Sequence, residues 1–294
     1  MAVIGIIGAG LIGSACARRL ISAGFEVVAF DVDPMKRTAV EKLGTRATAS
    51  VAEVSALSET VVLAVFNTDQ VEEVVEGQGG LIEAGNPSAP PPVICVSTCD
   101  PDRLAALAVR AAPRGVHMLE MPISGTSRQV ADGAGVGLVG GDRALMARLA
   151  PVLDAICARC YYLGQVGNAS RAKLAVNLIL GLNRAAMAEG LVFAERLGLD
   201  RAAFLDVARG SAAYSQVMDV KGPLMARRDY RNPQSRVDQS LKDFRLMLEQ
   251  AEKKGQALPF AEVYARMLED CIEHDEGGWD NAAISEAISR RRMT

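Results

Sequence analysis

The sequence predicts an α/β fold for its first half and an all-helical fold for its second half. Over the first half of the 294 residues, short apolar runs typical of strands alternate with helical stretches, as a parallel sheet with crossover helices requires. Half of the residues are hydrophobic, 27 are glycine and only 4% are aromatic, which favours an α/β protein over an all-β module. A chain of this length can hold one large domain or two ordinary ones.

Each predicted element of the first half has a local signal. Apolar runs bounded by turn residues predict the strands, and two Asp-Pro pairs, at 33–34 and 100–101, combine a helix cap with a proline suited to the first helical turn. We expect strands at 2–7, 26–31, 60–65, 93–97, 116–120, 135–139 and 160–163, and helices at 11–23, 34–43, 50–57, 68–76, 100–112 and 142–153.

The pattern changes after Gly164, where strand alternation ends. Helical periodicity then runs almost unbroken over residues 170–197. We therefore expect an α/β domain over residues 1–164 and a helical domain over 165–294, with a long connecting helix at 165–197. Further helices are predicted at 200–208, 236–254, 258–273 and 280–289.

A glycine-rich turn follows the first predicted strand. Its glycines have the spacing G-x-G-x-x-G between an apolar run and an apolar-periodic helix start, although a tight turn without a ligand is the alternative. The first glycine permits the turn, the second lets the backbone approach a pyrophosphate, and the third lets helix and strand pack closely. The N–H groups of the helix start would hold the phosphates. We therefore expect a Rossmann-like dinucleotide-binding domain with cofactor contacts at Gly8, Ala9, Gly10, Leu11, Ile12 and Gly13.

The second predicted strand ends in an acidic residue, Asp31. A carboxylate at this place in a dinucleotide-binding fold hydrogen-bonds the adenine ribose hydroxyls. It would repel a 2′-phosphate, and the residues that directly follow it are Val32 and Asp33 rather than an arginine. We therefore expect NAD, rather than NADP, as the cofactor.

The bulk properties of the chain exclude several classes of partner. The formal net charge of −3 gives no attraction for nucleic acid or for an anionic membrane surface. No uninterrupted apolar run approaches the ~20 residues of a membrane span. The N-terminus lacks a basic region and already forms the first predicted strand, so we expect no signal peptide and a cytoplasmic protein.

Cysteine and histidine usage limits the available chemistry. The six cysteines are scattered through apolar segments, which fits buried thiols in a reducing compartment, and Cys157-x-x-Cys160 is a lone C-x-x-C pair. The chain has only two histidines, so we expect no metal site, and acid/base chemistry should use another residue type.

Three further segments are candidates for this chemistry. Residues 96–101 and 121–126 each follow a predicted strand, at the edge where open sheets bind ligands, although each could be only a capped turn. Lys173 and Asn177 are four residues apart and project from one face of the connecting helix. The lysine could give and take a proton while the asparagine orients a substrate hydroxyl; a solvated surface pair is the alternative.

These motifs, in this order, resemble those of the β-hydroxyacid dehydrogenase family, which is 3-hydroxyisobutyrate dehydrogenase-like and part of the 6-phosphogluconate dehydrogenase superfamily. The resemblance covers nearly the whole chain and rests on five ordered motifs. Besides the glycine loop they are Ser97-Thr98 with Pro101 (S-T-x-x-P), Pro122–Gly125 (P-V-S-G), Gly164 and Gly167 with Lys173 and Asn177 (G-x-x-G…K-x-x-N-N), and Lys242-Asp243-Phe244 (K-D-L).

The resemblance implies an oxidoreductase that transfers a hydride between NAD and a small 3-hydroxy acid, or the corresponding semialdehyde acid in reverse. It implies that Lys173 is the acid/base residue and that Asn177 orients the substrate. It also implies a homodimer or homotetramer that associates through the helical region. The substrate carboxylate is expected on Ser124, Gly125 and Thr126, and further cofactor contacts are expected at Val65, Phe66, Thr98 and Lys242.

The chain departs from the family pattern in ways that leave the particular hydroxy acid, the direction and the pathway open. Glu120-Met121 stands where family members often have Asp-Ala, and Thr126 replaces a glycine beside the expected carboxylate site. Val176 replaces the first of two usual asparagines. Arg128, two residues after Thr126, either offers a cation to the substrate or lies in solvent.

Two alternatives from other classes are open. An imine reductase shares this architecture but usually lacks a lysine at the catalytic helix position, so Lys173 argues against it. A non-catalytic dinucleotide-sensing protein would keep the glycine loop and could lose the acid/base pair, so Lys173, Asn177 and Lys242 together argue against that function.

Overall fold

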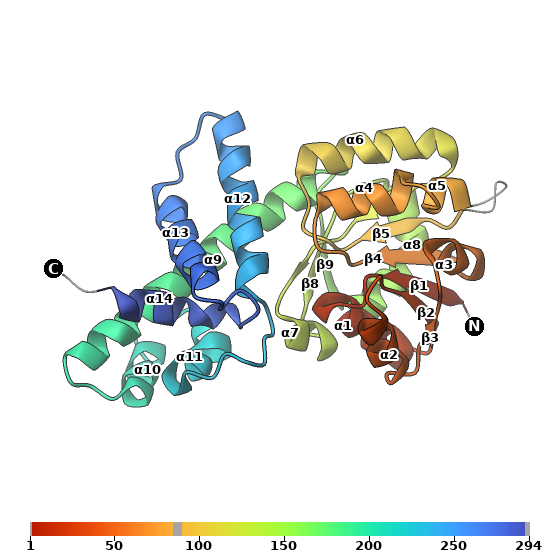
Figure 1. Cartoon of the computed structure of the whole chain (residues 1–294). Coiled ribbons are helices and arrows are strands. Elements are labelled where there is room, and N and C mark those ends of the chain that lie inside the picture. The colour runs from red at the N-terminus through yellow and green to blue at the C-terminus, as the bar shows by residue number, and fades with distance from the viewer. Residues whose placement is uncertain (1, 85–89, 292–294) are drawn as a thin grey trace. The chain divides into compact units, whose positions relative to one another are not determined.

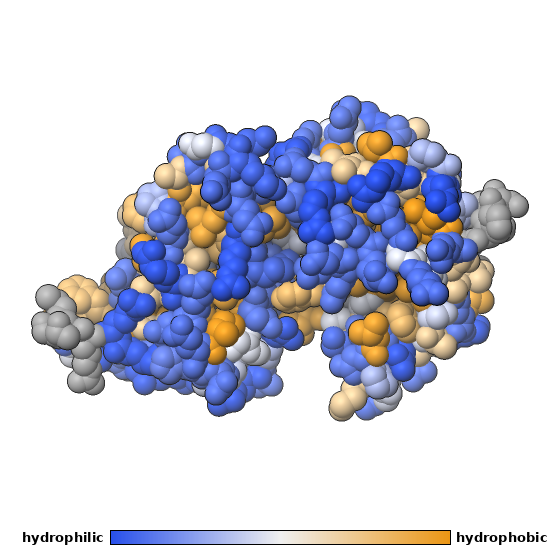
Figure 2. Space-filling view, turned by 45° about the horizontal axis from the view of Figure 1, so that its top comes forward, coloured by the Kyte–Doolittle hydropathy of each residue, from blue (hydrophilic) through white to orange (hydrophobic). Residues whose placement is uncertain are grey.

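The structure of the protein is a computed structural model that describes residues 2–84 and 90–291. Its contacts divide the chain into two compact units, Met1–Lys173 and Leu174–Thr294 (Figure 1). The division falls inside the long helix α9 (Asn168–Arg196), so the first turn of this helix packs with the first unit. The face shown in Figure 2 is mostly hydrophilic, and its hydrophobic residues gather in small groups, as is usual for a folded chain.

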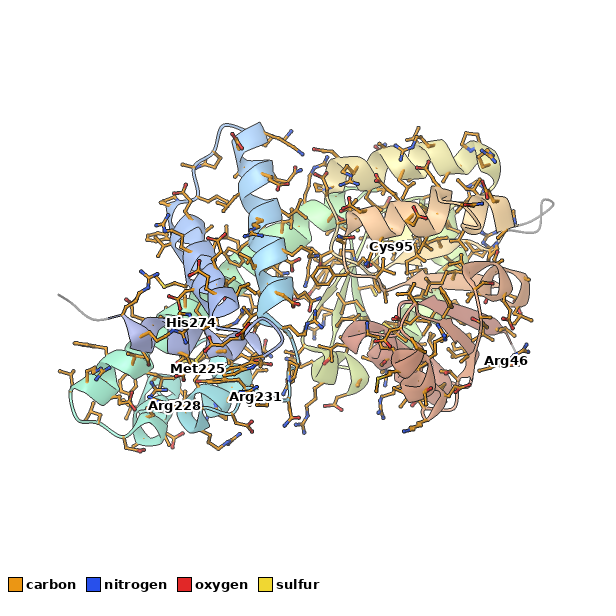
Figure 3. All side chains as sticks on the ribbon, viewed as in Figure 1. Arg46, Cys95, Met225, Arg228, Arg231 and His274 are labelled. Carbon is orange, nitrogen blue, oxygen red and sulfur yellow. The ribbon has the colours of Figure 1, made fainter. Side chains whose placement is uncertain are left out.

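The first unit contains a six-stranded parallel sheet with the strand order β3-β2-β1-β4-β5-β6. The order reverses between β1 and β4, and ligands bind at the carboxyl edge of such a switch point. Buried Cys95, labelled in Figure 3, belongs to a central strand of this sheet. The strands are β1 (Val3–Ile7), β2 (Glu26–Phe30), β3 (Arg46–Ala47), β4 (Thr60–Leu63), β5 (Val93–Cys95) and β6 (Met118–Glu120).

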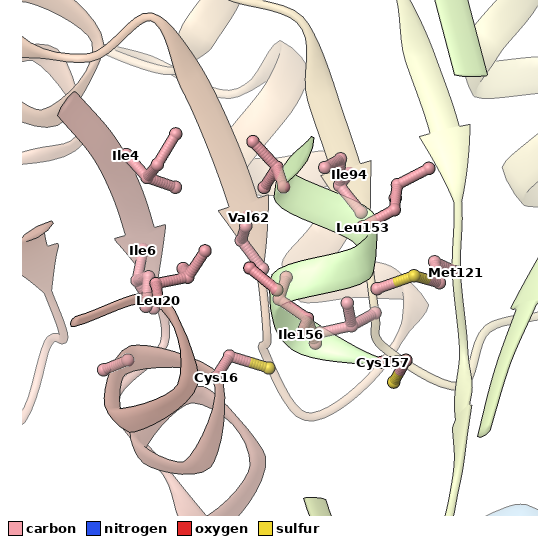
Figure 4. Close-up of a cluster of buried hydrophobic side chains, with 14 of the residues drawn as sticks. Ile4, Ile6, Cys16, Leu20, Val62, Ile94, Met121, Leu153, Ile156 and Cys157 are labelled. Carbon is pink, nitrogen blue, oxygen red and sulfur yellow. The ribbon is translucent and has the colours of Figure 1, made fainter. Parts of the chain in front are cut away.

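Helices cover both faces of the sheet because its strands are apolar on both sides. Ile4 and Ile6 of β1 pack in one core, which Figure 4 shows beside α1 and α8, while Val61 and Leu63 of β4 pack in the other. The first core includes α1 (Leu11–Ser22), α2 (Pro34–Glu41), α7 (Ser127–Ala131) and α8 (Arg143–Ile156), and the second includes α3 (Val51–Leu57), α4 (Thr68–Glu76), α5 (Leu81–Ala84) and α6 (Pro101–Ala111).

A smaller three-stranded sheet completes the first unit. Its order is β7-β8-β9, with β7 (Ile123–Ser124) antiparallel to β8 (Val136–Val139) and β9 (Arg159–Tyr162) parallel to β8. The last residue of β6, Glu120, also pairs with Gly140 directly after β8. These pairings support the turn that follows β7.

The second unit is helical. Its core contains the buried side chains of Leu241, Phe244, Tyr264 and Leu268, and the rings of Phe244 and Tyr264 are 4.4 Å apart. Met225, labelled in Figure 3, belongs to the same core. Besides the later turns of α9, the helices are α10 (Arg201–Arg209), α11 (Val217–Arg227), α12 (Val237–Lys253), α13 (Pro259–Glu273) and α14 (Ile284–Arg290).

A buried ion pair holds the segment that enters α12. Lys221 Nζ lies 2.7 Å from Asp280 Oδ2, and both side chains are almost fully buried. The same carboxylate accepts hydrogen bonds from the backbone N–H groups of Gln234 and Ala282 at 2.8 and 3.0 Å. Burial lowers the pKa of Lys221 to about 8, against the opposing attraction of Asp280. The Asp280 carboxylate therefore holds the segment that leads into α12, and loss of either partner would leave a buried charge unpaired, which is costly.

The fold class expected from the sequence is confirmed: a Rossmann-like α/β domain is followed by a long helix and further helices. All seven predicted strands and every predicted helix are present, with shifted ends. The missed elements are short (β3, β7, α5 and α7), except for α11. Gly222-Pro223 lies inside α11, and this pair conceals the helical periodicity of the sequence.

Within the described residues, α9 is long and apolar enough, by length and composition alone, to cross a membrane. This qualifies the sequence-based expectation, because that expectation considered uninterrupted apolar runs and α9 is interrupted by Arg184 and Glu189. The buried side chains of α9 beyond Lys173 include Leu174, Met187 and Leu191, which pack in the core of the second unit. Packing therefore accounts for part of the apolar character of this helix.

Candidate functional site

The glycine loop joins β1 to α1 through contacts that side chains would block. Gly8 has a φ of +96°, which L side chains rarely adopt. A Cβ on Gly13 would lie only 1.8 Å from the carbonyl oxygen of Gly8, so α1 begins against the end of β1. A Cβ on Gly10, by contrast, would meet nothing within 4 Å. The loop therefore packs tightly on one side and leaves open space at Gly10.

The N-terminus of α1 has the features of a phosphate-binding helix end. Its N-cap is Gly10, and no side chain caps it, whereas Asp33, Asn67 and Asp142 cap helices elsewhere in this unit. Unbonded N–H groups at a helix start, together with the helix dipole, favour an anion. The open space at Gly10 fits the close approach of a dinucleotide pyrophosphate.

Asp31 lies directly after β2 and is buried against the glycine loop. Its Oδ2 accepts a hydrogen bond from Ala9 N at 2.8 Å, and its Oδ1 accepts one from Asp33 N at 2.9 Å. These bonds hold the carboxylate in one position while each oxygen keeps a further lone pair. Asp31 can therefore hold the loop and accept a ribose hydroxyl.

Two basic residues lie close to Asp31, which the sequence reasoning overlooked. Lys36 Nζ is 3.8 Å from Asp31 Oδ1, and Arg37 donates a hydrogen bond of 2.7 Å to the backbone oxygen of Asp31. In sequence, the residues directly after Asp31 are Val32 and Asp33, neither of which is basic. Because α2 begins at Pro34, its first turn brings residues 36 and 37 back toward the end of β2, a signal that the predicted helix at 34–43 already contained.

The loops after β4 and β5 are tied together at the same edge of the sheet. Ser97 donates a hydrogen bond of 2.8 Å to the backbone oxygen of Val65. Phe66 is partly exposed, and its N–H donates to Gln70 Oε1 at 2.8 Å. Thr98 is partly buried directly after Ser97. The predicted cofactor residues of both loops thus share the carboxyl edge, and their contacts with the cofactor stay predictions.

The turn after β7 contains the three residues predicted to bind the substrate carboxylate. Ser124 is partly buried, and Gly125 has a φ of +142°, a backbone conformation that favours glycine. Thr126 is the N-cap of α7: its hydroxyl accepts from Gln129 N, while the Gln129 side chain accepts from Thr126 N. Thr126 therefore has a role in helix capping that the sequence reasoning did not consider. Arg128 is exposed and lies 3.8 Å from Asp132.

Lys173 reaches this turn from the first part of α9. The lysine is 6% exposed, and its Nζ donates a hydrogen bond of 2.6 Å to the backbone oxygen of Ile123, next to Ser124. A surface lysine, which was the alternative interpretation, would extend into solvent. The structure places the predicted acid/base residue beside the predicted substrate turn.

Asn177 belongs to a polar group in the second unit. Its Nδ2 donates to Asp243 Oδ2 at 3.1 Å, and Lys242 Nζ lies 2.9 Å from the other oxygen of Asp243. A Cβ on Gly181 would lie 2.5 Å from the Phe244 ring, so this glycine lets α12 approach α9 closely. The close approach places Asp243 beside Asn177, which lies one turn before Gly181 on α9.

The sequence reasoning missed the part that Asp243 plays. It matched the Lys242-Asp243-Phe244 motif but assigned a role only to the lysine. The structure shows Asp243 bonded to both Asn177 and Lys242, so its carboxylate links two residues predicted to act on different molecules. The signal was the adjacency of Asp243 to Lys242, but pairing with Asn177 cannot be read from residues 66 positions apart in sequence.

Comparison with known proteins identifies the family. A family model described as the NAD binding domain of 6-phosphogluconate dehydrogenase matches residues 3–164, and one described as NAD-binding of NADP-dependent 3-hydroxyisobutyrate dehydrogenase matches residues 167–288. The chain belongs to the β-hydroxyacid dehydrogenase family. It is therefore an oxidoreductase that uses a nicotinamide dinucleotide.

Individual relatives agree with this assignment over nearly the whole chain. L-threonate dehydrogenase of Cupriavidus necator is 32% identical over 96% of this chain and 94% of its own length. Glyoxylate/succinic semialdehyde reductase 2, a chloroplastic protein of Arabidopsis thaliana, is 30% identical over 97% of this chain and 79% of its own. The structure is similar to that of 3-hydroxyisobutyrate dehydrogenase from Salmonella typhimurium, with a TM-score of 0.88, 27% identity and coverage of 97% and 99% of the two chains.

The glycine loop yields a prediction that separates packing from ligand binding. Gly13→Ala should destabilise the protein by about 2–4 kcal/mol, because the added Cβ overlaps the Gly8 oxygen. Gly10→Ala should leave the melting temperature nearly unchanged but weaken NADH binding by roughly tenfold or more, because the methyl group occupies the open space. Thermal unfolding and fluorescence titration with NADH measure the two effects. Normal NADH binding by folded Gly10→Ala would contradict the proposed pyrophosphate position.

Proposed function

We propose that the protein interconverts a small 3-hydroxy acid and the corresponding semialdehyde acid, with NAD as the cofactor. The observation that carries this proposal is the buried Nζ of Lys173, 2.6 Å from the backbone oxygen of Ile123, directly before the predicted substrate turn. The names of the relatives support the substrate class, because they describe two dehydrogenases of hydroxy acids and one reductase of glyoxylate and a semialdehyde.

Each residue of the turn has a definite task in this proposal. The backbone N–H of Gly125 and the hydroxyl of Ser124 bind the substrate carboxylate, and the backbone at Gly125 leaves room for it. Thr126 contributes by holding the turn in place, since its N–H donates to Gln129 Oε1 and its hydroxyl accepts from Gln129 N. Asn177, one turn after Lys173 on α9, orients the substrate hydroxyl.

Lys173 moves the proton of the reaction. In oxidation, neutral Lys173 Nζ takes the proton of the substrate hydroxyl as the carbon–oxygen double bond forms. In reduction, the Lys173 ammonium returns that proton to the carbonyl oxygen. The nicotinamide, when bound, supplies the complementary step by accepting or donating the hydride. The hydrogen bond to Ile123 holds Nζ at the turn throughout, because a lysine can donate to this oxygen in either protonation state.

Replacement of the lysine tests the mechanism. Lys173→Ala should lower kcat by roughly 10²–10⁴-fold, because general acid/base catalysis contributes about that much. The dissociation constant for NADH should change little, since Lys173 is not among the residues assigned to the dinucleotide. Those residues lie in the glycine loop, at Asp31, in the loops after β4 and β5 and at Lys242. Steady-state kinetics with a panel of small 3-hydroxy acids and NADH titration measure both quantities.

Arg171→Ala is the matched control. Arg171 lies two residues earlier on the same helix, is exposed, and forms an ion pair with Asp102 at 2.6 Å. Removal of such an exposed pair changes stability by less than about 1 kcal/mol and should leave kcat unchanged. If Lys173→Ala kept most of its turnover while Arg171→Ala did the same, the assigned acid/base role would be wrong.

We propose NAD rather than NADP because Asp31 is buried and fixed by two backbone N–H groups. A carboxylate held in this way would repel a 2′-phosphate. Lys36, whose side chain is 47% exposed, is the opposing influence, because its ammonium could approach such a phosphate. Because the carboxylate of Asp31 is fixed where the ribose is expected, its repulsion of a 2′-phosphate should outweigh the attraction from the flexible Lys36.

The preference for NAD can be measured as a ratio of kcat/KM values. NAD should be favoured by about tenfold to a hundredfold, which corresponds to about 1.4–2.8 kcal/mol. Asp31→Asn keeps an oxygen for Ala9 N but removes the charge, so it should narrow the ratio. Lys36→Ala should widen the ratio. Equal or better kcat/KM with NADP in the unaltered protein would show that Lys36 and Arg37 outweigh Asp31.

We also propose that the protein is a homo-oligomer that associates through one face of α9. Ile179 and Phe193 lie on the side of this helix opposite the buried Arg184 and are 62% and 63% exposed. Leu197, directly after the helix, is 64% exposed, and Val176, near its start, is 37% exposed. An exposed apolar stripe of this length is typical of an interface between subunits.

We further propose that the protein acts in a reducing, cytoplasmic compartment, which its six free cysteines support.

Light scattering tests the association. The protein should have at least twice the 31.1 kDa mass of one chain, and Ile179→Glu should lower this mass by placing a charge in the interface. Val109→Glu is the control, because Val109 is 73% exposed on α6 of the first unit. A single-chain mass for the unaltered protein at micromolar concentration would contradict the proposal.

A further inference from the structure

Glu120 is a fully buried carboxylate for which the proposed mechanism has no task. It is the last residue of β6, and it is 0% exposed. Its Oε1 accepts hydrogen bonds from Gly167 N at 2.5 Å and Ala169 N at 2.9 Å. Its Oε2 accepts from the N–H and the hydroxyl of Ser170 at 3.0 and 2.5 Å. Four donors from the start of α9 therefore converge on one side chain.

These bonds satisfy donors that a helix leaves unpaired. The first N–H groups of an α-helix have no partner within the helix. At the start of α9, Glu120 binds three of them, and Asn168 N donates to the oxygen of Gln165 at 3.2 Å. The first intrahelical bond then runs from Arg171 N to the oxygen of Gly167. The position of the first turn of α9 in this unit is thus set by a residue of the central sheet.

Residues 120–123, which include Glu120, also hold the Nζ end of the Lys173 side chain. Lys173 follows Ser170 by one helical turn, and its Nζ donates to Ile123, which is three residues after Glu120. The backbone of Lys173 is therefore fixed through Glu120, and its ammonium is fixed through Ile123. Both attachments come from residues 120–123.

We propose that Glu120 is a positioning residue, whose cap on α9 sets the location of Lys173 relative to the substrate turn. This inference rests on the proposed function, in which Lys173 transfers the proton. Glu120 does not touch substrate or cofactor in this scheme. It acts through the helix that carries the lysine.

The charge of Glu120 suits this task. Burial raises the pKa of Glu120, and the hydrogen bonds from Ser170, Ala169 and Gly167 oppose that rise. A carboxylate accepts at both oxygens, and it also interacts favourably with the positive end of the helix dipole. A neutral amide in its place would present an NH₂ group to one pair of donors, so at least one backbone N–H would lose its acceptor.

The space around the carboxylate is closely matched to it. A Cβ on Gly140, the residue that pairs with Glu120, would lie 2.4 Å from Glu120 Oε1. The chain therefore lacks a side chain at Gly140, where one would displace the carboxylate. Glutamate at position 120, in place of the aspartate common in the family, has one more methylene with which to reach α9.

Glu120→Gln tests the proposal with two independent readouts. Hydrogen exchange of the amides in residues 167–173 should become at least tenfold faster, which reports the cap without reference to activity. The kcat per NADH-binding site should fall roughly 10- to 100-fold, because a small displacement of a reacting group has an effect of that order. The dissociation constant for NADH should stay within about twofold. Counting sites by NADH titration removes unfolded molecules from the comparison, so a loss of fold alone would not lower this kcat.

Asp142→Asn is the matched control. Asp142 caps α8 in the same unit, and its carboxylate accepts a hydrogen bond of 2.7 Å from Leu145 N. This variant should speed exchange only at the start of α8 and leave kcat per site unchanged.

Two milder variants apply if Glu120→Gln does not fold. Ser170→Ala removes one of the four hydrogen bonds, and Glu120→Asp keeps the charge but has a shorter side chain. Both should speed exchange at residues 167–173 and lower kcat per site, by smaller factors than Glu120→Gln.

The outcomes separate this inference from the proposed function. Unchanged exchange at 167–173, or faster exchange with kcat per site within threefold of the unaltered protein, would show that Glu120 does not position Lys173. If Lys173→Ala itself kept its turnover, the proposed function would fail, whereas faster exchange in Glu120→Gln would still establish the cap. Loss of turnover in both variants, with faster exchange in Glu120→Gln, supports both.

Discussion

The dinucleotide-binding part of the structure depends on a contact that no side chain could occupy, the approach of Gly13 to the oxygen of Gly8. Because α1 begins against the end of β1, its first N–H groups face the carboxyl edge of the sheet. The same arrangement brings Ala9 N within 2.8 Å of Asp31 at the end of the neighbouring strand. A single steric constraint thus sets both the helix end where the phosphates are expected and the carboxylate that is expected to bind the ribose. Asp31 in turn stabilises the glycine loop through its hydrogen bond with Ala9 N.

A second constraint is the continuity of α9. Its first turn is bonded to the α/β unit, and its later turns pack in the core of the helical unit. Lys173 and Asn177 lie on either side of this division. Because they are four residues apart on one helix, their separation along the axis is about 6 Å wherever the two units sit. Through its own backbone hydrogen bonds, the helix therefore fixes the spacing between Lys173, proposed for proton transfer, and Asn177, proposed to orient the substrate.

The sequence could predict the features that depend on local pattern. Apolar runs bounded by turn residues located the strands, helical periodicity located the long helices, and the glycine spacing located the turn at Gly8. The face shared by Lys173 and Asn177 followed from helix geometry. Contacts between distant segments could not be predicted in this way. Asp243 pairs with Asn177 because Gly181 lets two helices approach, and Glu120 meets α9 because β6 ends where that helix begins. Both depend on tertiary packing that no single segment encodes.

Thr126 shows how a departure from a family pattern can have a structural cause. In sequence, a threonine in place of glycine, with Arg128 two residues later, left open whether this edge offers a cation to the substrate or lies in solvent. In the structure the hydroxyl accepts from Gln129 N in a capping box, and the Arg128 side chain is 76% exposed beside Asp132. A capped α7 holds the turn at Ser124 and Gly125 more firmly than an uncapped one, because the N–H groups of its first turn are satisfied. The threonine therefore contributes to the rigidity of the turn at which the substrate carboxylate is expected.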